Sequence, residues 1–343
     1  MILTVTPNPA LDLTWHVDRI HVGETHRAEV AAMRAGGKGI NVARVAHAQG
    51  TTVRAVTTAG GRTGEELAAE LRSSGVPHSL VPVAGATRRS IALVDEQRGD
   101  TTVINERGLN PTDAEWATLI GEVVDALPGA GVLVISGSLP PGAPRTLLPL
   151  LIGLGKDAGI PVIVDTSGPA LLQAADAGAS VLKPNAAELV EATGIADPIE
   201  GARVLLERGA SLVLLSRGAE GMLAITGSGA PRIVNARLPE SIAGNPTGAG
   251  DAAVAACAVL LDAGVTDPEQ ILRSATAWSA AAVLMPLAGE IHASWPDLER
   301  AVEIRPGFEP TSPARDTTSG MVSRAEHVAS QDPEPLCDPK DPA

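Results

Sequence analysis

Asn245-Pro-Thr-Gly-Ala-Gly-Asp251 is a cluster of turn-forming residues that leads directly into an apolar run, Ala252-Ala-Val-Ala-Ala-Cys-Ala-Val-Leu-Leu261. The length and alanine content of this run predict a buried helix. A glycine turn that opens into a helix leaves several backbone N–H groups without partners, and the helix dipole adds to their positive charge. The stretch therefore predicts a binding site for an anion at the start of the helix.

Asp251 lies at the mouth of this anion site, where a carboxylate is unfavourable unless it has a function. One interpretation is a general base, which takes a proton from a hydroxyl group while the neighbouring N–H groups hold phosphate charge. The other interpretation is an N-terminal helix cap flanked by glycines. The stretch by itself leaves both interpretations open.

Two further motifs precede this one in the chain, Gly36-Gly-Lys-Gly-Ile-Asn-Val-Ala-Arg44 and Lys183-Pro-Asn-Ala-Ala-Glu-Leu189. Together with Thr247-Gly-Ala-Gly-Asp251, they resemble the signatures of the ribokinase/PfkB family of sugar kinases. The three motifs follow the family's order, and the resemblance covers about residues 1–305. It implies a kinase that uses ATP and Mg²⁺.

The resemblance assigns a role to each residue of the glycine turn. It implies that Asp251 is the catalytic base. It also implies that Gly248, Ala249 and Gly250 form the anion hole for the transferred phosphoryl group.

The opening segment, Thr6-Pro-Asn-Pro-Ala-Leu-Asp12, follows a short predicted strand, 2–6. A carboxylate just past a strand end lies where α/β proteins place ligand contacts, although a turn residue of the Asx type fits the spacing as well. The segment resembles the opening of the phosphofructokinase-like branch of the family. That resemblance implies that Asp12 binds sugar hydroxyl groups.

The glycines of the motif at 36–44 allow a ligand to approach the backbone closely, and Asn41 falls in the first turn of the helix that follows. The motif is not a Walker A loop, because no Ser or Thr follows Lys38 and the glycine spacing differs. From the residues alone it is equally a tight turn with a solvated lysine. The resemblance implies that Gly37 and Asn41 contact the sugar, with Lys38 as a further candidate.

Two more residues are candidates for binding a phosphorylated sugar. Arg88 precedes an alternating strand, 91–94, and the planar guanidinium group of arginine donates two parallel hydrogen bonds to phosphate. A single arginine is otherwise a surface residue, and the resemblance favours Arg88 over Arg89. Ser138 follows a buried strand, 132–136, where its hydroxyl binds a sugar or phosphate oxygen or caps the next helix.

The residues expected to bind ATP follow two predicted strand ends, in 181–185 and 212–216. The loop Arg217-Gly-Ala-Glu-Gly221 resembles the family's ATP-binding loop, although the family usually has an aliphatic residue in place of Arg217. The resemblance implies contacts with ATP from Lys183, Asn185, Glu188, Ser216, Gly218 and Gly221. An Ala-rich helix, 275–284, is expected to wall the adenine.

Asn185 and Glu188 are three residues apart at a predicted helix start, so their side chains face the same side. Two oxygen-bearing side chains there are suited to Mg²⁺, held through waters because Mg²⁺ keeps part of its hydration shell. The same spacing predicts a capping box. The two interpretations are not exclusive.

Alternating strand and helix patterns predict a three-layer α/β/α core with a mostly parallel sheet. The resemblance implies that the fold class of this core is ribokinase-like. Strand pairs at about 12–33 and 88–105 predict a small β-sheet lid beside the site. The resemblance implies that this lid also forms a homodimer interface. The kinase domain is expected to span 1–306. The segment 307–343 is rich in Pro and acidic residues, with no apolar period, and is predicted to be a disordered tail.

Composition limits the partners of the chain. The 343 residues carry a net charge of −14, which argues against nucleic acid and against an anionic membrane surface. The start of the chain, Met1-Ile-Leu-Thr-Val-Thr, reads as a strand and not as a signal peptide. The two cysteines, Cys257 and Cys337, are far apart in the sequence, so a disulfide is not expected. The expected location is therefore the reducing cytoplasm.

These motifs together predict a kinase that transfers the γ-phosphoryl group of ATP to a primary hydroxyl of a phosphorylated ketohexose. The opening motif resembles the 1-phosphofructokinase and tagatose-6-phosphate kinase branch. Fructose 1-phosphate and the 6-phosphates of fructose and tagatose therefore remain open as substrates. Two alternatives are a kinase of the same fold for an unphosphorylated sugar or nucleoside, and a non-catalytic sensor of sugar phosphates.

Overall fold

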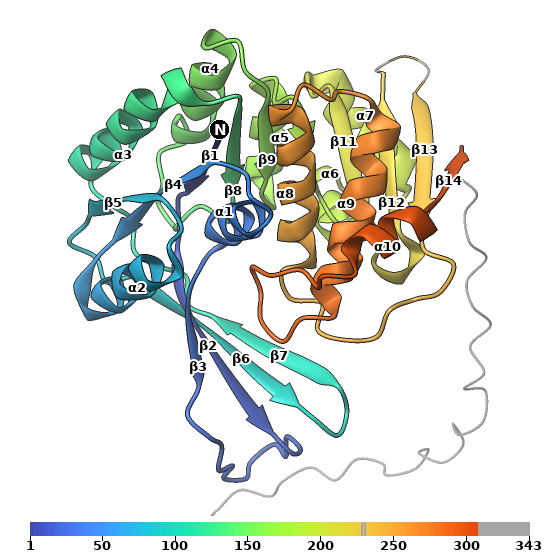
Figure 1. The fold of residues 1–343 in the computed structure, drawn as a ribbon. Helices are drawn as coiled ribbons and strands as arrows, with labels where there is room; N and C mark the ends of the chain where they lie inside the picture. The colour runs from blue at the N-terminus through green and yellow to red at the C-terminus, as the bar shows by residue number, and fades with distance from the viewer. Residues whose placement is uncertain (228, 230, 308–343) are drawn as a thin grey trace, which may run out of the picture. The chain divides into compact units, whose positions relative to one another are not determined.

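The computed structural model describes residues 1–227, 229 and 231–307 of the chain. Ten strands form one large sheet in the order β14-β13-β12-β11-β10-β9-β8-β1-β4-β5 (Figure 1). They are β1 (Ile2–Thr6), β4 (Val53–Ala59), β5 (His78–Pro82), β8 (Val132–Ser136), β9 (Val162–Asp165), β10 (Val181–Leu182), β11 (Leu212–Ser216), β12 (Met222–Thr226), β13 (Arg232–Arg237) and β14 (Glu303–Pro306). Strands β5 to β11 along this order pair in parallel, and β11 to β14 pair antiparallel. The predicted mostly parallel sheet is confirmed.

Helices cover both faces of the large sheet (Figure 1). They are α1 (Lys38–Ala48), α2 (Gly61–Ser74), α3 (Asp113–Ala126), α4 (Leu147–Asp157), α5 (Pro169–Asp176), α6 (Ala186–Thr193), α7 (Pro198–Arg208), α8 (Ala249–Asp262), α9 (Pro268–Val283) and α10 (Trp295–Ala301), with 3₁₀ turns η1 (Leu127–Gly129) and η2 (Gly218–Glu220). The predicted buried helix after Asp251 is α8, whose residues 251–258 are buried.

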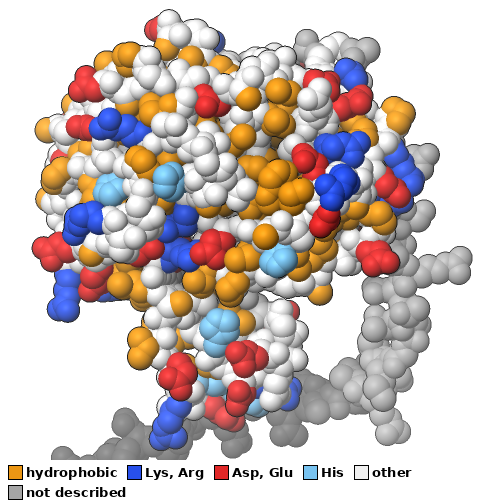
Figure 2. Space-filling model, viewed as in Figure 1, with side chains coloured by type: hydrophobic (Ala, Val, Ile, Leu, Met, Phe, Trp, Pro, Cys, Tyr) orange, Lys and Arg blue, Asp and Glu red, His pale blue; other side chains and the backbone are white. Residues whose placement is uncertain are grey.

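Alternate residues of each central strand pack into different hydrophobic clusters. In β8, Val132 and Val134 belong to the cluster that contains α1, α8 and α9, whereas Leu133 and Ile135 belong to the cluster that contains α3, α4, α5 and α7. Because both faces are covered, these strands are apolar throughout. The three-layer α/β/α class predicted from the sequence is therefore observed. Hydrophobic side chains also gather over α8 and α9 on the face shown in Figure 2.

A second sheet of four strands, in the order β3-β2-β6-β7, projects from the core beneath α1 and α2 (Figure 1). Its strands are β2 (Ala10–Val17), β3 (Ala32–Gly36), β6 (Arg88–Asp95) and β7 (Asp100–Asn105). We call it the lid sheet. It consists of two hairpins joined through parallel pairing of β2 with β6.

The lid sheet has one apolar and one polar face. The register places Met33, Leu13, Ile91 and Ile104 in one row across the four strands, and directly opposed residues share a face. The next row contains Arg34, Asp12, Ser90 and Asn105 and faces the other way. Functional polar groups and apolar groups therefore alternate along the same strands.

The strand limits differ from the sequence prediction in two places. Ala28 and Val30 lie outside β3, because the segment before this strand is solvated, with Val30 95% exposed, and has no partner strand. Asp12 lies within β2 of the lid sheet, whereas it was expected in the loop after β1.

Three other expectations concern the chain outside the core. No helix in the part of the chain that the structure describes is long and apolar enough to cross a membrane. Cys257 is buried in α8 as a free thiol. The predicted disordered tail lies outside the described residues from residue 308 onward, as does Cys337.

Candidate active site

The candidate site lies at the carboxyl ends of the parallel strands, on both sides of β1. From β1 the chain proceeds to β4 and β5 on one side of the sheet and later to β8, β9 and β10 on the other. The helices that follow strands on opposite sides of such a switch point diverge, which leaves a crevice for ligands at the strand ends. The starts of α1 and α8 close this crevice from above the sheet.

Asp251 lies in the first turn of α8 and is only 6% exposed. Its Oδ2 accepts a hydrogen bond of 2.8 Å from Nδ2 of Asn41, which is buried in the first turn of α1. A buried carboxylate with a single neutral donor is poorly stabilised in its charged form. Burial accordingly raises the pKa of Asp251 to about 6, although the Lys38 ammonium opposes this shift and Asp165 adds to it.

The glycine turn before α8 depends on the backbone conformation of glycine and not on a capping side chain. Gly248 is the N-cap residue, with a φ of +84° that favours glycine, and no side chain caps the helix. The first-turn N–H groups of α8 thus lack side-chain acceptors, as an anion site requires. A Cβ built on Gly250 would lie 3.2 Å from the Lys183 ammonium nitrogen, so this cation is placed against the turn.

A buried carboxylate that the sequence reading missed, Asp165, organises two lysines beside this turn. Asp165 ends β9 and is fully buried. Its Oδ1 lies 3.1 Å from Nζ of Lys38 and 3.8 Å from Nζ of Lys183. Burial acts to raise the pKa of Asp165, but the two lysines outweigh it, so the pKa lies below its usual range.

Lys38 is therefore not a solvated lysine in a tight turn, because its ammonium group forms ion pairs with Asp165 and Glu188. Burial acts to lower the pKa of Lys38, but Asp165, Glu188 and Asp251 together raise it above its usual range, so the ammonium is fully charged. Its Nζ also lies 3.6 Å from Oε1 of Glu188. The sequence holds only a local sign of Asp165, since the apolar strand 162–164 ends on a carboxylate just as 2–6 is followed by Asp12.

A cavity of about 760 Å³ opens between the β11–β12 loop, the glycine turn and α9. All six residues predicted to bind ATP line it: Lys183, Asn185, Glu188, Ser216, Gly218 and Gly221. Lys38, Ala249 and Gly250 form the end of the cavity next to Asp251, and Ala280 and Val283 of α9 form an aliphatic wall. The cavity thus has a charged end and an apolar end, which suits a nucleotide with its phosphates toward Asp251.

Asn185 and Glu188 form the capping box that their spacing predicted. Asn185 Oδ1 accepts from the Glu188 backbone N–H at 2.8 Å, and Glu188 Oε2 accepts from the Asn185 backbone N–H at 2.9 Å. Glu188 Oε1, on the cavity side, faces Lys38. Among the described residues, no group of three or more His, Cys, Asp or Glu side chains is placed to hold a metal ion. Mg²⁺ commonly binds phosphate oxygens and water with few protein ligands, and Glu188 is a carboxylate in the lining of the cavity that also faces Lys38.

Arg217 does not obstruct the cavity, although it departs from the family pattern. Its Nη1 pairs with Oε2 of Glu220 at 3.0 Å, and its side chain is 8% exposed. Ser216 and Gly218 line the cavity on either side of it, and Arg217 does not.

Asp12 projects from the polar face of the lid sheet toward the site. A Cβ on Gly36, which is paired with Ala10 on β2, would overlap the Asp12 carboxylate, so this position of β3 leaves room for the side chain only because it is glycine. Burial raises the pKa of Asp12 to about 7; Arg88 opposes this shift and Asp251 adds to it. Asp12 and Asp251 are therefore close enough for their charges to interact, which places both in one site.

Arg88 lies at the root of the lid sheet, where β6 begins. Its guanidinium group donates to the backbone carbonyls of Asn8, at 3.2 and 3.3 Å, and of Glu106, at 3.3 Å. The Asn8 side chain in turn donates to Ser138 Oγ at 3.2 Å, which brings Ser138 to the same corner. Asn8 was not predicted, and no side-chain pattern marks it, because it acts by its position after β1.

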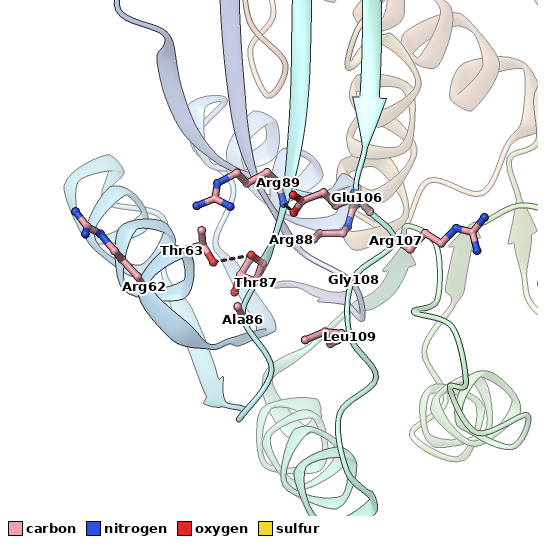
Figure 3. A pocket seen from close by; sticks show the side chains of 10 residues that line it. All are labelled: Arg62, Thr63, Ala86, Thr87, Arg88, Arg89, Glu106, Arg107, Gly108 and Leu109. Carbon is pink, nitrogen blue, oxygen red and sulfur yellow. Dashed lines mark hydrogen bonds between the residues drawn. The ribbon is translucent and has the colours of Figure 1, made fainter. Parts of the chain in front are cut away.

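A pocket of about 380 Å³ flanks Arg88 on the side of α2. Figure 3 shows that Arg89 extends toward Thr63, whereas Arg62 and Arg107 extend away from the pocket. Neighbouring residues on a strand face opposite ways, so Arg88 and not Arg89 shares the polar face with Asp12.

Comparison with known proteins places this fold and site in a family. Residues 7–293 match the family model described as pfkB family carbohydrate kinase. The chain belongs to the PfkB family of carbohydrate kinases, which confirms the resemblance carried by the three motifs.

Individual relatives agree with this assignment. The chain is 37% identical over 286 residues to the 1-phosphofructokinase of Xanthomonas campestris pv. campestris, covering 81% of this chain and 89% of that protein. It is 34% identical over 321 residues to the ATP-dependent 6-phosphofructokinase isozyme 2 of Mycobacterium tuberculosis, covering 92% of each. The structure of phosphofructokinase-2 from Escherichia coli in complex with fructose-6-phosphate matches with a TM-score of 0.77 and 30% identity, covering 87% of this chain and 98% of that one.

Proposed function

We propose that this carbohydrate kinase transfers the γ-phosphoryl group of ATP to a primary hydroxyl of a phosphorylated ketohexose. The observation that carries the proposal is the position of Asp251. This buried carboxylate lies between the charged end of the nucleotide cavity, with Lys38 and Lys183, and the acceptor side, with Asp12. The names of the relatives, which include a 1-phosphofructokinase and 6-phosphofructokinases, support a ketohexose phosphate as the acceptor.

In this mechanism Asp251 is the general base. With a pKa of about 6 it is ionised at neutral pH but basic enough to accept the proton of the attacking hydroxyl. Asn41 fixes the orientation of the carboxylate through the bond to Oδ2. Because charge develops on the transferred group in a loose transition state, the N–H groups of 248–250 and the Lys183 ammonium stabilise it where it forms.

Phosphate recognition on the acceptor side is assigned to Arg88 and Ser138, and hydroxyl recognition to Asp12, Gly37 and Asn41. Arg88 is held by two carbonyl groups and its pKa is lowered by burial, with the Asp12 and Glu106 carboxylates acting in the opposite direction. A guanidinium group has five N–H donors, so donors remain for a phosphate. Lys38 is assigned to the phosphate end of the nucleotide, since it lines that cavity and pairs with Glu188.

The residues present fit ATP with Mg²⁺. The cavity volume, its aliphatic wall and its two lysines suit the nucleotide, and Glu188 is the carboxylate best placed to orient a hydrated Mg²⁺. When bound, the metal would neutralise charge on the phosphate oxygens. Asp165 holds Lys38 and Lys183 in place beside that position.

A coupled assay of ADP release tests the proposal with four sugars: fructose 1-phosphate, fructose 6-phosphate, tagatose 6-phosphate and free fructose. Turnover with one of the phosphorylated sugars supports the proposal and identifies the substrate. Turnover with free fructose alone would favour a kinase for unphosphorylated sugars. Absence of turnover with all four, although the sugars bind, would favour the non-catalytic sensor.

We further propose that a second copy of the chain covers the apolar face of the lid sheet. Met33 and Ile104, at the two ends of the apolar row, are 47% and 53% exposed. Burying such a row against its own copy in a two-fold dimer removes apolar surface from water on both sides. Light scattering should report a dimer for the wild type and a monomer for Ile104→Lys. A monomeric wild type would exclude this interface.

The proposed location is the cytoplasm. A buried free thiol, Cys257, needs no oxidising environment, and ATP is the proposed donor. Fractionation of cells with an antibody against the chain tests this.

A further inference from the structure

Arg34 connects the lid sheet to the part of the chain that follows α9. Its Cα is paired directly with that of Asp12 across β2 and β3, so both side chains lie on the polar face of the lid sheet. Its Nη1 donates to the backbone carbonyl of Ala288 at 2.7 Å, and its Nη2 lies 2.5 Å from Oε1 of Glu290. A two-pronged contact of this kind fixes both the position and the orientation of what it holds. The Arg34 side chain is 18% exposed, so water screens the pair only in part.

The segment that Arg34 holds is in direct contact with the catalytic turn. We call this segment, residues 284–290, the α9–α10 turn. A Cβ on Gly248 would lie 2.8 Å from the Ala288 Cβ, so these two residues are packed as closely as glycine allows. A Cβ on Gly289 would lie 3.2 Å from Oδ1 of Asn41, the side chain that orients Asp251. Asn245 is also tied to this turn, through a bond of 3.0 Å from its Nδ2 to the Pro286 carbonyl.

We propose that Arg34 and Glu290 are positioning residues that couple acceptor binding on the lid sheet to the placement of the glycine turn at 248–250. The chain of contacts runs from Asp12 to Arg34 across one strand pair, then to Ala288 and Glu290, then to Gly248. Neither Arg34 nor Glu290 touches the nucleotide cavity. The inference rests on the proposed function, since it assigns Asp12 to the acceptor and Gly248 to the transferred phosphoryl group.

The contact between Ala288 and Gly248 can transmit a displacement of the lid sheet because the two residues are tightly packed. A gap between Ala288 and Gly248 would absorb a displacement of the lid, whereas two backbones in van der Waals contact move together. When the acceptor draws the lid sheet toward the site, the α9–α10 turn is drawn with it and presses the glycine turn into place. By thermodynamic linkage, the acceptor must then tighten nucleotide binding, and the nucleotide must tighten acceptor binding by the same factor.

The test measures this factor by calorimetry. The dissociation constant of AMP-PNP with Mg²⁺ is determined with and without the ketohexose phosphate that the wild type phosphorylates. Couplings of this kind are about 5- to 150-fold, and we expect the wild type to fall in this range. In Arg34→Met and in Glu290→Ala, the factor by which the ketohexose phosphate tightens AMP-PNP binding should fall below about 3-fold. Loss of a charge-assisted contact should also lower kcat about 10-fold, while AMP-PNP alone binds within about twofold of the wild type.

The two variants separate the coupling from other effects of the substitution. Arg34→Met also removes a cation near Asp12, whereas Glu290→Ala leaves that cation in place and breaks the contact from the side of the α9–α10 turn. Arg232→Met, which removes an exposed ion pair with Glu269 far from the site, is the matched control and should keep the wild-type factor. Arg34→Lys should keep part of the coupling factor, since a lysine can re-form one of the two contacts, with Ala288 or with Glu290.

Four results would overturn parts of this account, and they are distinguishable. A wild type that phosphorylates no ketohexose phosphate removes the proposed function, and this inference with it. An active wild type without coupling, or variants that keep the wild-type factor and only melt at lower temperature, removes the coupling role alone. A reduced factor in Arg232→Met would show that the effect is one of general stability.

Discussion

The nucleotide cavity is walled mainly by strand ends, the loop 238–246 and α9, with Gly99 of the β6–β7 turn also contributing, whereas the acceptor side is closed by strands of the lid sheet. On the nucleotide side some candidate residues come from a motif that also determines their local structure, as the capping box of Asn185 and Glu188 does. On the acceptor side the functional residues are held by distant segments. Arg88 is fixed by the backbone of Asn8, 80 residues away, and Arg34 by Ala288, 254 residues away.

This difference has a consequence for how each side responds to substitution. Core strand ends are held by the whole sheet, so a change in the cavity should affect nucleotide binding alone. In the lid strands Leu11 and Ala35 pack into the core, but Arg34 and Arg88 are held by a few polar contacts. A change at these two residues should therefore alter acceptor binding and the geometry of the catalytic turn together. The following predictions are ordered by the size of the expected effect, and each tests this separation.

The largest effect is expected for the residue that the two sides share. Asp251→Asn removes the base but keeps the size of the side chain, and should lower kcat by about 10²- to 10⁴-fold. Binding of ATP should be retained, since Asp251 adjoins the cavity without lining it. Steady-state turnover and calorimetry with AMP-PNP measure the two quantities. Turnover near that of the wild type would remove Asp251 from its assigned role.

Arg88→Ala should affect the acceptor side selectively. A charge-assisted bidentate contact contributes about 1.5–3 kcal/mol, so KM for the phosphorylated ketohexose should rise about 10- to 150-fold. KM for ATP and any weak activity on free fructose should change little. Arg88→Lys should recover only part of the loss, because an ammonium group cannot reproduce the fork of guanidinium donors. An equal drop for phosphorylated and free sugar would mean that Arg88 supports the lid and does not bind the phosphate.

Ala280→Trp is the corresponding test on the nucleotide side. Ala280 lines the aliphatic end of the cavity on α9, so a large side chain there occupies part of the space for the base. Overpacking of this kind costs about 1–3 kcal/mol, and KM for ATP should rise at least ~5-fold with KM for the sugar phosphate unchanged. A parallel rise in both constants would contradict the separation of the two sides.

The smallest effect is a change in pH dependence. Asp251 must be ionised to accept a proton, so kcat should rise with pH through an apparent pKa of about 6 and then level off. Lys38 is the cation that most favours the ionised form of Asp251. Lys38→Met should therefore raise the pKa of Asp251 and move this limb to higher pH by about one unit. Profiles of kcat against pH for the wild type and for Lys38→Met test this prediction. A shift of the rising limb to lower pH in the variant would contradict the role assigned to Lys38.

The capping box of Asn185 and Glu188 could be predicted because helix caps are local patterns, and the structure confirms it. The contacts of Lys183, Asn185 and Glu188 with ATP were implied by the resemblance to the family and stay predictions. Asp165 was missed for a different reason. Its strand was predicted, but a single carboxylate at a strand end has no partner in sequence, and its role appears only when Lys38 and Lys183 converge on it.

Arg34 and Asn8 could not be predicted from sequence at all. Both act through backbone carbonyls or through their place in a strand register, and neither depends on a local motif. The lid sheet itself was predicted from alternation, but its second strand was placed too early, because the segment before residue 32 also alternates. Pairing with a neighbouring strand, and not side-chain pattern, decided where this strand begins.

The alternation of the lid sheet limits which insertions and deletions the chain can tolerate. Asp12, Arg34 and Arg88 share the polar face only because each lies at a matching position in its strand. Adding or removing one residue between Thr6 and Ala10 would turn every side chain of β2 to the opposite face, with Leu13 toward the substrate and Asp12 toward solvent. Changes of two residues would preserve the face. In homologous chains, each insertion or deletion within the lid strands should therefore span an even number of residues, whereas the connection at 18–31 is free to vary in length.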